Sequence, residues 1–118
     1  MTAQIEAATA VRVCHVNELL PGRGVAALID GEQVALFRVG GEVFAVQQRD
    51  PYSGAQVMSR GIVGTRGDRV TVASPMFKQV FDLTTGECLE TLGKPALALD
   101  VWPVTVDADG SVHVGPRP

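Results

Sequence analysis

Cysteine and histidine are the side chains best suited to bind metals or form cross-links, and this chain of 118 residues holds two of each. Cys14 and Cys88 lie far apart, whereas a disulfide framework needs more cysteines at closer spacing. We therefore expect two reduced, mostly buried thiols. Cys14 and His15 are adjacent, so on a strand they point to opposite faces, and His113 lies in a distant alternating segment. No pair has the spacing of metal ligands, which favours ordinary strand positions for all four residues.

The elements that must position any functional residue are short strands. Segments rich in Val, Ile, Leu and Phe alternate with glycine-bearing turns, a pattern typical of β structure. Asp30-Gly31 and Gly40-Gly41 are two-residue hairpin signals, so the second, third and fourth expected strands form an antiparallel meander. The expected strands are Val11–Val16, Val25–Ile29, Val34–Val39, Val43–Val46, Val70–Ala73, Gln79–Leu83, Leu99–Val106 and Val112–Val114.

Evidence for helices is limited to single turns at Glu18–Leu20 and Ala55–Ser59. No segment of roughly eleven residues shows an amphipathic helical period. The predicted fold class is all-β, a small antiparallel barrel or sandwich, with residues 1–118 forming one domain.

Composition excludes several classes of protein. Hydrophobic residues make up 46% and charged residues 19% of the chain, which is incompatible with a disordered charged tail. The net charge of −3 argues against general nucleic-acid binding, which requires a basic excess. No run approaches the roughly 18 apolar residues that span a bilayer, and the N-terminus lacks the pattern of a secretory signal. We therefore expect a cytoplasmic protein with no nucleic-acid or membrane partner.

Basic residues concentrate between Arg49 and Val80. This stretch has five basic and two acidic residues, whereas the remainder has five basic and eleven acidic residues. Its strand periodicity is weaker, and it holds every methionine except the initiator. Loops on rigid scaffolds commonly carry function, so the stretch is a candidate functional region. The alternative is that these charges are scattered on solvated faces.

Two passages resemble the two halves of a Rieske iron–sulfur domain. They are VFAVQQRDPYSGAQ, from Val43 to Gln56, and VASPMFKQVFDLTTGECLE, from Val72 to Glu90. In that family a strand leads into a C-P-H loop, and a later strand leads into C-P-x-H-G and an F-D-L-x-T-G-E hairpin. Phe81–Glu87 matches the hairpin, and the loop prolines are Pro51 and Pro75. The resemblance implies a Rieske-like antiparallel β sandwich or barrel, with a small loop-rich subdomain at residues 49–80 like the one that binds the cluster.

The ligands of the cluster are all replaced. By position, Asp50 and Ser74 stand where the family has cysteines, and Tyr52 and Phe77 stand where it has histidines. Phe77 has no donor atom, and Ser74 and Tyr52 do not ionise at neutral pH. The resemblance therefore implies a Rieske scaffold without a [2Fe–2S] cluster and without metal ligands.

This pattern of replacements resembles one family in particular, the small subunits of assimilatory NAD(P)H-dependent nitrite reductase. The motifs are Ser74–Phe81, with the sequence SPMFKQVF, and Val57–Gly61 after the first loop. In that family a large subunit carries FAD, a [4Fe–4S] cluster and sirohaem, and the complex reduces nitrite to ammonium. The resemblance implies that this chain binds no cofactor itself and docks on such a large subunit, with no catalytic residue of its own.

Tyr52 and Phe77 have two interpretations if the loops keep the Rieske course. They fill the space that the cluster leaves, because voids are costly, or they anchor an interface, where aromatic, Met and Arg side chains are enriched. Both roles can also be shared between them. Residues that would flank the interface are Arg49, Met58, Arg60, Met76 and Lys78. The Asp50 carboxylate is expected to cap the amide of Ser53 or Gly54 in an Asx turn.

Three functions compete on this basis. The first is the cluster-free docking subunit of nitrite reductase. The second is a free-standing electron-transfer ferredoxin, which requires metal. The third is an interaction or regulatory module for another oxidoreductase. A small independent enzyme is disfavoured, because no nucleophile–base pair or ligand set is legible in the sequence.

Overall fold

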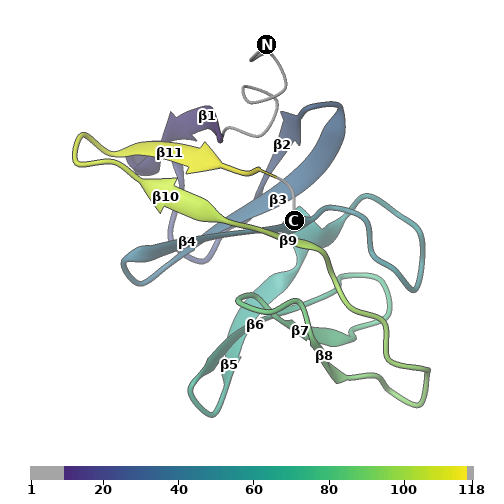
Figure 1. Cartoon of the computed structure of the whole chain (residues 1–118). Coiled ribbons are helices and arrows are strands. Elements are labelled where there is room, and N and C mark those ends of the chain that lie inside the picture. The colour runs from purple at the N-terminus through teal and green to yellow at the C-terminus, as the bar shows by residue number, and fades with distance from the viewer. Residues whose placement is uncertain (1–9, 117–118) are drawn as a thin grey trace.

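The computed structural model describes residues 10–116, and its regular structure is almost entirely strand (Figure 1). The strands are β1 (Val11–His15), β2 (Val25–Ile29), β3 (Glu32–Val39), β4 (Glu42–Gln47), β5 (Ile62–Arg66), β6 (Arg69–Ala73), β7 (Val80–Asp82), β8 (Cys88–Glu90), β9 (Val101–Trp102), β10 (Val104–Val106) and β11 (Ser111–Val114). Two single-turn 3-10 helices, η1 (Val16–Glu18) and η2 (Met58–Arg60), complete the set. The predicted all-β class is confirmed.

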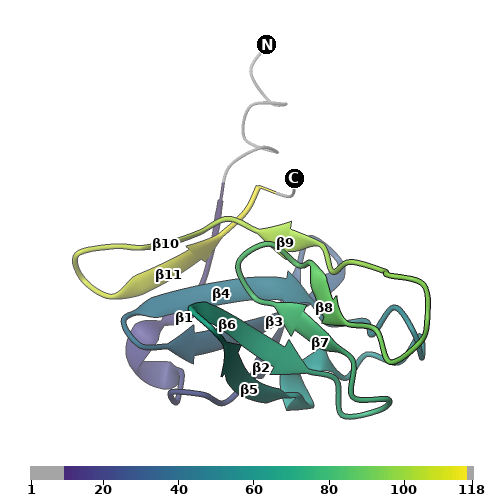
Figure 2. The same cartoon turned by 90° about the horizontal axis from the view of Figure 1, so that it is seen from below.

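The strands form three antiparallel sheets, which Figure 2 shows from a second side. Their orders are β1-β11-β10, β2-β3-β4-β9 and β5-β6-β7-β8. The meander predicted from the Asp30-Gly31 and Gly40-Gly41 turns is confirmed as β2-β3-β4. Successive hairpins thus build each sheet mainly from strands that are neighbours in sequence.

Strand β3 is buried on both faces, and this explains the unbroken apolar run Val34–Phe37. Side chains alternate across a strand, so Val34 and Leu36 enter one core and Ala35 and Phe37 enter the other. The first core packs against the sheet of β1, β10 and β11. The second packs against the sheet of β5–β8, and it fixes the base of the loops at that end.

Three strand predictions differ from the structure. β5 and β8 were missed, because β5 is a mostly exposed outer strand and β8 has only three residues. The expected strand Leu99–Val106 is two strands, since Pro103 has no N–H to continue a ladder. β9 pairs with β4, whereas β10 pairs with β11. The two expected helical turns occur as η1 and η2, each shifted by a few residues.

Candidate functional site

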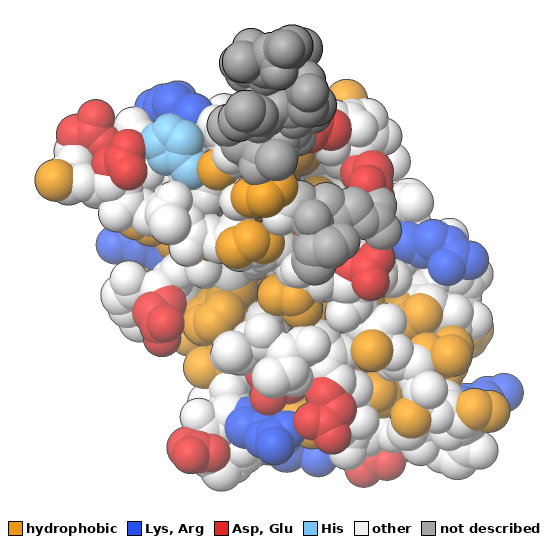
Figure 3. All heavy atoms as spheres, in the orientation of Figure 1, with side chains coloured by type: hydrophobic (Ala, Val, Ile, Leu, Met, Phe, Trp, Pro, Cys, Tyr) orange, Lys and Arg blue, Asp and Glu red, His pale blue; other side chains and the backbone are white. Residues whose placement is uncertain are grey.

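Three loops lie together on one side of the molecule, on the right in both Figures 1 and 2. Loop 1 covers residues 48–57 after β4, loop 2 covers 74–79 between β6 and β7, and loop 3 covers 91–100 between β8 and β9. Hydrophobic side chains gather over this part of the surface at the lower right of Figure 3. The positively charged stretch predicted from sequence therefore supplies two of the three loops.

Loop 1 is closed by hydrogen bonds that start and end at Asp50. The Asp50 N–H donates to the Ala55 carbonyl at 2.8 Å, and the Gly54 N–H donates to the Asp50 carbonyl at 2.7 Å. The carboxylate Oδ1 of Asp50 accepts from the Tyr52 N–H at 2.8 Å. The predicted Asx turn is present, but the prediction that the Asp50 carboxylate accepts from the Ser53 or Gly54 amide is wrong. Pro51 has no N–H, so Tyr52 supplies the first amide that the Asx turn can reach.

Loop 2 repeats this arrangement around Ser74. The Ser74 N–H donates to the Gln79 carbonyl at 2.9 Å, and the Lys78 N–H donates to the Ser74 carbonyl at 3.2 Å. The Ser74 Oγ accepts from the Met76 N–H at 3.1 Å. The fifth residue counted from Asp50 or from Ser74 is left-handed, with φ of 81° at Gly54 and 70° at Lys78. The two loops therefore have one geometry, set by local hydrogen bonds.

A buried hydrogen bond joins the two loops. The Ser74 hydroxyl donates to the second carboxylate oxygen of Asp50, with Oγ and Oδ2 2.5 Å apart. Both side chains are almost fully buried. Buried polar groups are costly unless they are paired, so each residue satisfies the other and fixes the distance between the loops.

Tyr52 turns inward and ties loop 1 to loop 3. Its ring packs against the second core and lies 6.2 Å from the Phe81 ring, centroid to centroid. Its hydroxyl donates to the Pro95 carbonyl at 2.7 Å and accepts from the Leu97 N–H at 2.9 Å. Burial, followed by the contact with Cys88, raises the pKa of this phenol. The half-buried Tyr52 is therefore a structural link between loop 1, loop 3 and the second core.

Phe77, in the middle of loop 2, faces solvent, whereas Tyr52 faces the protein interior. The Phe77 side chain is 53% exposed, and that of the preceding Met76 is 47% exposed. Lys78 is also exposed and forms no ion pair among residues 10–116. Loop 2 therefore presents two apolar side chains and a cation to solvent on a backbone that is closed by its own hydrogen bonds.

The residues at the four ligand positions do not fit a [2Fe–2S] cluster. Such a centre in this fold needs two thiolates and two imidazoles. The Asp50 and Ser74 oxygens are in direct hydrogen-bonding contact, which leaves no place for iron between them. The Tyr52 hydroxyl is bonded to loop 3, and Phe77 has no donor atom. In the described part of the chain, no group of three or more His, Cys, Asp or Glu side chains is arranged to hold a metal ion.

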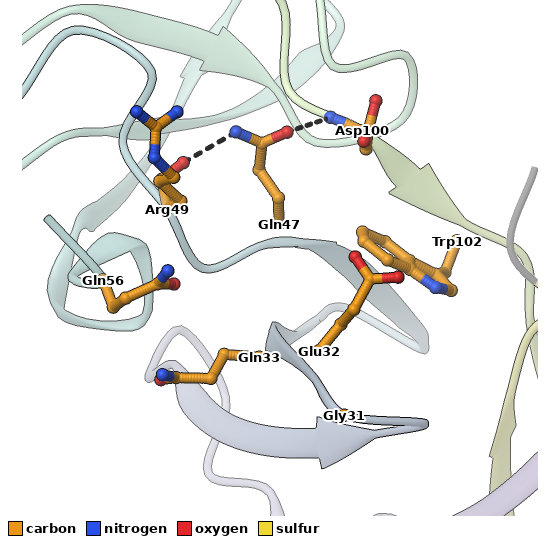
Figure 4. A pocket seen from close by; sticks show the side chains of 8 residues that line it. All are labelled: Gly31, Glu32, Gln33, Gln47, Arg49, Gln56, Asp100 and Trp102. Carbon is orange, nitrogen blue, oxygen red and sulfur yellow. Dashed lines mark hydrogen bonds between the residues drawn. The ribbon is translucent and has the colours of Figure 1, made fainter. Parts of the chain in front are cut away.

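Arg49 lies beside a polar hollow of about 400 Å³ at the base of loop 1 (Figure 4). The Gln47 amide crosses this hollow, donating to the Arg49 carbonyl at 2.8 Å and accepting from the Asp100 N–H at 2.7 Å. Glu32 and Asp100 line the same hollow, and Trp102 forms its far wall in Figure 4. Because Gln47 is bonded to both Arg49 and Asp100, we assign the hollow a structural role in joining loop 1 to loop 3.

Two other residues predicted to flank an interface lie elsewhere. Met58 is fully buried in the second core, so its prediction as a partner contact is wrong. The hydrophobic side chain faces inward from η2, and the exposed residue of that turn is Arg60. Arg60 lines a groove between η2 and the segment before β2.

Both cysteines are free thiols, but they are half-buried rather than mostly buried. Burial raises the pKa of the Cys14 thiol. Cys88 lies next to the candidate site, with its Sγ 3.6 Å from the Tyr52 hydroxyl oxygen. His15 caps η1 through Nδ1, and its Nε2 lies 2.7 Å from the Asp109 carbonyl oxygen. These contacts account for His15 as a structural residue.

Sequence reasoning missed the residue that fixes the end of loop 1. Gln48 is buried, and its amide accepts from the Ser59 N–H at 2.7 Å and donates to the Ser59 Oγ at 2.9 Å. Its backbone carbonyl accepts from the Met58 N–H at 2.9 Å. Gln48 follows directly after β4 and precedes Arg49, so only the tertiary structure distinguishes it from an exposed loop amide.

The comparisons with known proteins agree with this geometry. The model of the Rieske-like [2Fe-2S] domain family matches residues 9–115. The nitrite reductase (NADH) small subunit of Salmonella typhimurium is 45% identical over 80 residues, which cover 66% of this chain and 74% of that protein. This chain belongs to the nitrite reductase small-subunit family. A solved structure from Mycobacterium tuberculosis, assigned as an NADH-dependent nitrite reductase small subunit, is 46% identical. It superposes with a TM-score of 0.86 over 94% of this chain and 97% of that one.

A large subunit also contains a segment similar to this small subunit. The nitrite reductase [NAD(P)H] large subunit of Klebsiella oxytoca is 36% identical over 103 residues, covering 87% of this chain and 10% of that protein. The small-subunit sequence thus has a counterpart inside a large-subunit chain. Residues 10–116 contain no helix with the length and apolarity that crossing a bilayer requires.

Proposed function

We propose that this small subunit is a cluster-free docking domain of assimilatory nitrite reductase. It acts as a single domain in the cytoplasm, binds no cofactor of its own and contributes no catalytic residue. The large subunit supplies FAD, a [4Fe–4S] cluster and sirohaem, and the complex reduces nitrite to ammonium with electrons from NAD(P)H. The similar segment within a large-subunit chain supports a lasting association between the two parts.

The observation that carries this proposal is the direct bond between Asp50 and Ser74. It closes the cluster position with protein atoms while each loop keeps its hydrogen-bonded course. An electron-carrying role needs a redox centre at this position, whereas a docking role needs only ordered loops with exposed anchors. The chemistry of these two side chains therefore favours docking over electron transfer by this chain.

Loop 2 is the proposed contact surface. Met76 and Phe77 give apolar area, and Lys78 gives a positive charge that favours an acidic partner surface. Aromatic and Met side chains are enriched at interface centres, where a few residues carry most of the binding energy. Arg49, exposed beside the hollow at the base of loop 1, adds a second positive charge on the loop side of the molecule. Tyr52 holds the loops in place from inside and contacts the partner only through them.

The test is titration of the purified large subunit with Phe77→Asp, measuring the dissociation constant and nitrite-dependent NAD(P)H oxidation. We expect at least about tenfold weaker binding, because a charge replaces an apolar anchor. Val106→Asp is the matched control, since Val106 is also an exposed apolar residue and lies on β10, away from the loops (Figure 1). Unchanged binding by Phe77→Asp would remove loop 2 as the contact surface.

A further inference from the structure

A second surface beside the loops combines apolar and positive side chains. It is a groove of about 530 Å³ between the segment 20–24, which precedes β2, and the residues 59–63, which run from η2 into β5. Leu20 is 55% exposed on one wall, and Ile62 is 69% exposed on the other. Each wall also carries one exposed arginine, Arg23 on the first and Arg60 on the second.

The backbone of the first wall is held in place by packing and hydrogen bonds, so its exposed side chains project from a fixed position. Leu19 is buried in the first core directly before the exposed Leu20. The Arg38 guanidinium donates to the carbonyls of Val16 and Leu19 at 3.3 and 3.2 Å. The Gly22 N–H donates to the Arg38 carbonyl at 2.7 Å. The chain is therefore fastened on both sides of Leu20.

The second wall is fastened in the same manner. Met58 is buried, and Gln48 bonds both the backbone and the side chain of Ser59, directly before Arg60. The two walls touch at the floor of the groove, because a Cβ on Gly24 would collide with the Ser59 carbonyl oxygen. Little ordering entropy remains to be lost at such a surface when a partner binds.

The charge of the groove is unbalanced. Its lining has two arginines and no acidic residue, on a protein whose net charge is −3. Among the ion pairs of residues 10–116, neither Arg23 nor Arg60 takes part. Two unpaired cations beside two exposed aliphatic side chains are complementary to carboxylates that flank an apolar residue.

We propose that this groove binds an acidic, apolar segment of the large subunit, as a docking site separate from loop 2. This inference rests on the proposed function for the identity of the partner. The segment places an apolar side chain between Leu20 and Ile62, and its carboxylates pair with Arg23 and Arg60. The groove thus sets the orientation of the small subunit, which a single contact at loop 2 leaves free to rotate.

The experiment titrates the purified large subunit with Arg23→Glu, Arg60→Glu and the double variant, each at low and high salt. We expect each reversal to weaken binding about tenfold, and the double variant to lose or reverse the salt dependence seen with the unaltered chain, because its glutamates repel the partner carboxylates. Ile62→Thr keeps a β-branched residue on the outer strand and tests the apolar part. Arg66→Glu is the matched control, since Arg66 has the same charge at the far end of β5.

The outcomes separate this inference from the proposed function. If the Arg23 and Arg60 reversals bind as well as Arg66→Glu, the groove is not a docking site, whatever Phe77→Asp does. If they weaken binding while Phe77→Asp does not, the groove stands and loop 2 is excluded. Sedimentation of the chain alone tests a second copy as occupant: a dimer that the double variant dissociates would overturn the inference. Urea unfolding of every variant checks that the fold is intact.

Discussion

Replacing Ser74 by alanine tests whether the loops are held together by the bond that takes the place of cluster ligation. The serine hydroxyl donates to the Asp50 carboxylate at 2.5 Å and accepts from the Met76 N–H at 3.1 Å. Alanine removes both bonds and leaves a buried carboxylate oxygen without its donor. The small volume change adds little, since only one oxygen atom is lost.

The expected loss of stability follows from these two bonds. A hydrogen bond to a charged group contributes about 1.5–3 kcal/mol, and a neutral one about 0.5–1.5 kcal/mol. Ser74→Ala should therefore lower the free energy of unfolding by about 2–4.5 kcal/mol, a large part of the 5–15 kcal/mol typical of a domain. Urea unfolding measures this loss, provided that the slope of the unfolding free energy against urea concentration is unchanged.

Ser53→Ala is the control, because it makes the same chemical change in loop 1. Among residues 10–116, the half-buried Ser53 Oγ accepts only from the Ala55 N–H, at 3.2 Å, so the expected loss is below about 1 kcal/mol. In a double-mutant cycle, the interaction energy between Asp50→Ala and Ser74→Ala should be about 1.5–3 kcal/mol, because both substitutions remove the same bond. Equal losses for the two serines, or additive effects in the cycle, would refute the reasoning.

Two further predictions concern loop 1 and the turn 82–87 between β7 and β8. Tyr52 is the only tyrosine, so ultraviolet titration of tyrosinate reports it alone; its pKa should lie above the ordinary value of about 10. Because the folded state then holds the proton more tightly than the unfolded chain, stability should fall as the pH rises above about 10, and Tyr52→Phe should reduce that fall. Gly86→Ala should destabilise by more than about 3 kcal/mol, since φ is +80° and a Cβ would collide with the Leu99 carbonyl. Gly54→Ala, with φ of +81° and a Cβ in ordinary contact with Arg49 Nη2 at 3.6 Å, should cost only about 1–2 kcal/mol in thermal or urea unfolding.

The central part of the fold was predictable because its signals are local. Two-residue glycine turns define the β2-β3-β4 meander, and the unbroken run Val34–Phe37 is typical of a strand buried on both faces. β5 had a usable signal in Gly67-Asp68, a two-residue turn of hairpin type, but its exposed residues conceal the strand. The break at Pro103 was also legible, since proline cannot continue a paired strand.

The candidate site was predictable only in part, because its contacts are long-range. The resemblance placed Asp50 opposite Ser74, but their hydrogen bond joins residues 24 positions apart. The Tyr52 hydroxyl finds its partners 43 and 45 residues further along, in a loop that carries no motif. Met58 was misassigned for the same reason: a methionine between two loops gives no local sign of whether it faces the core or solvent.

The loss of cluster ligands did not require a new scaffold, because the loop geometry is encoded in the backbone. The segment 82–87 has the arrangement of loops 1 and 2: the Asp82 N–H donates to the Glu87 carbonyl, and the Gly86 N–H donates to the Asp82 carbonyl, both at 2.8 Å. The Asp82 Oδ1 accepts from the Thr84 N–H at 2.7 Å. This third copy of the six-residue turn lies outside the ligand positions. The turn needs an Asp or Ser at its first position, local backbone amides and a left-handed fifth residue, and it needs no metal. Each loop can therefore fold with or without a metal ligand at its first residue. An Asp–Ser pair can replace a pair of thiolates, and the outer face of loop 2 then remains available to a partner.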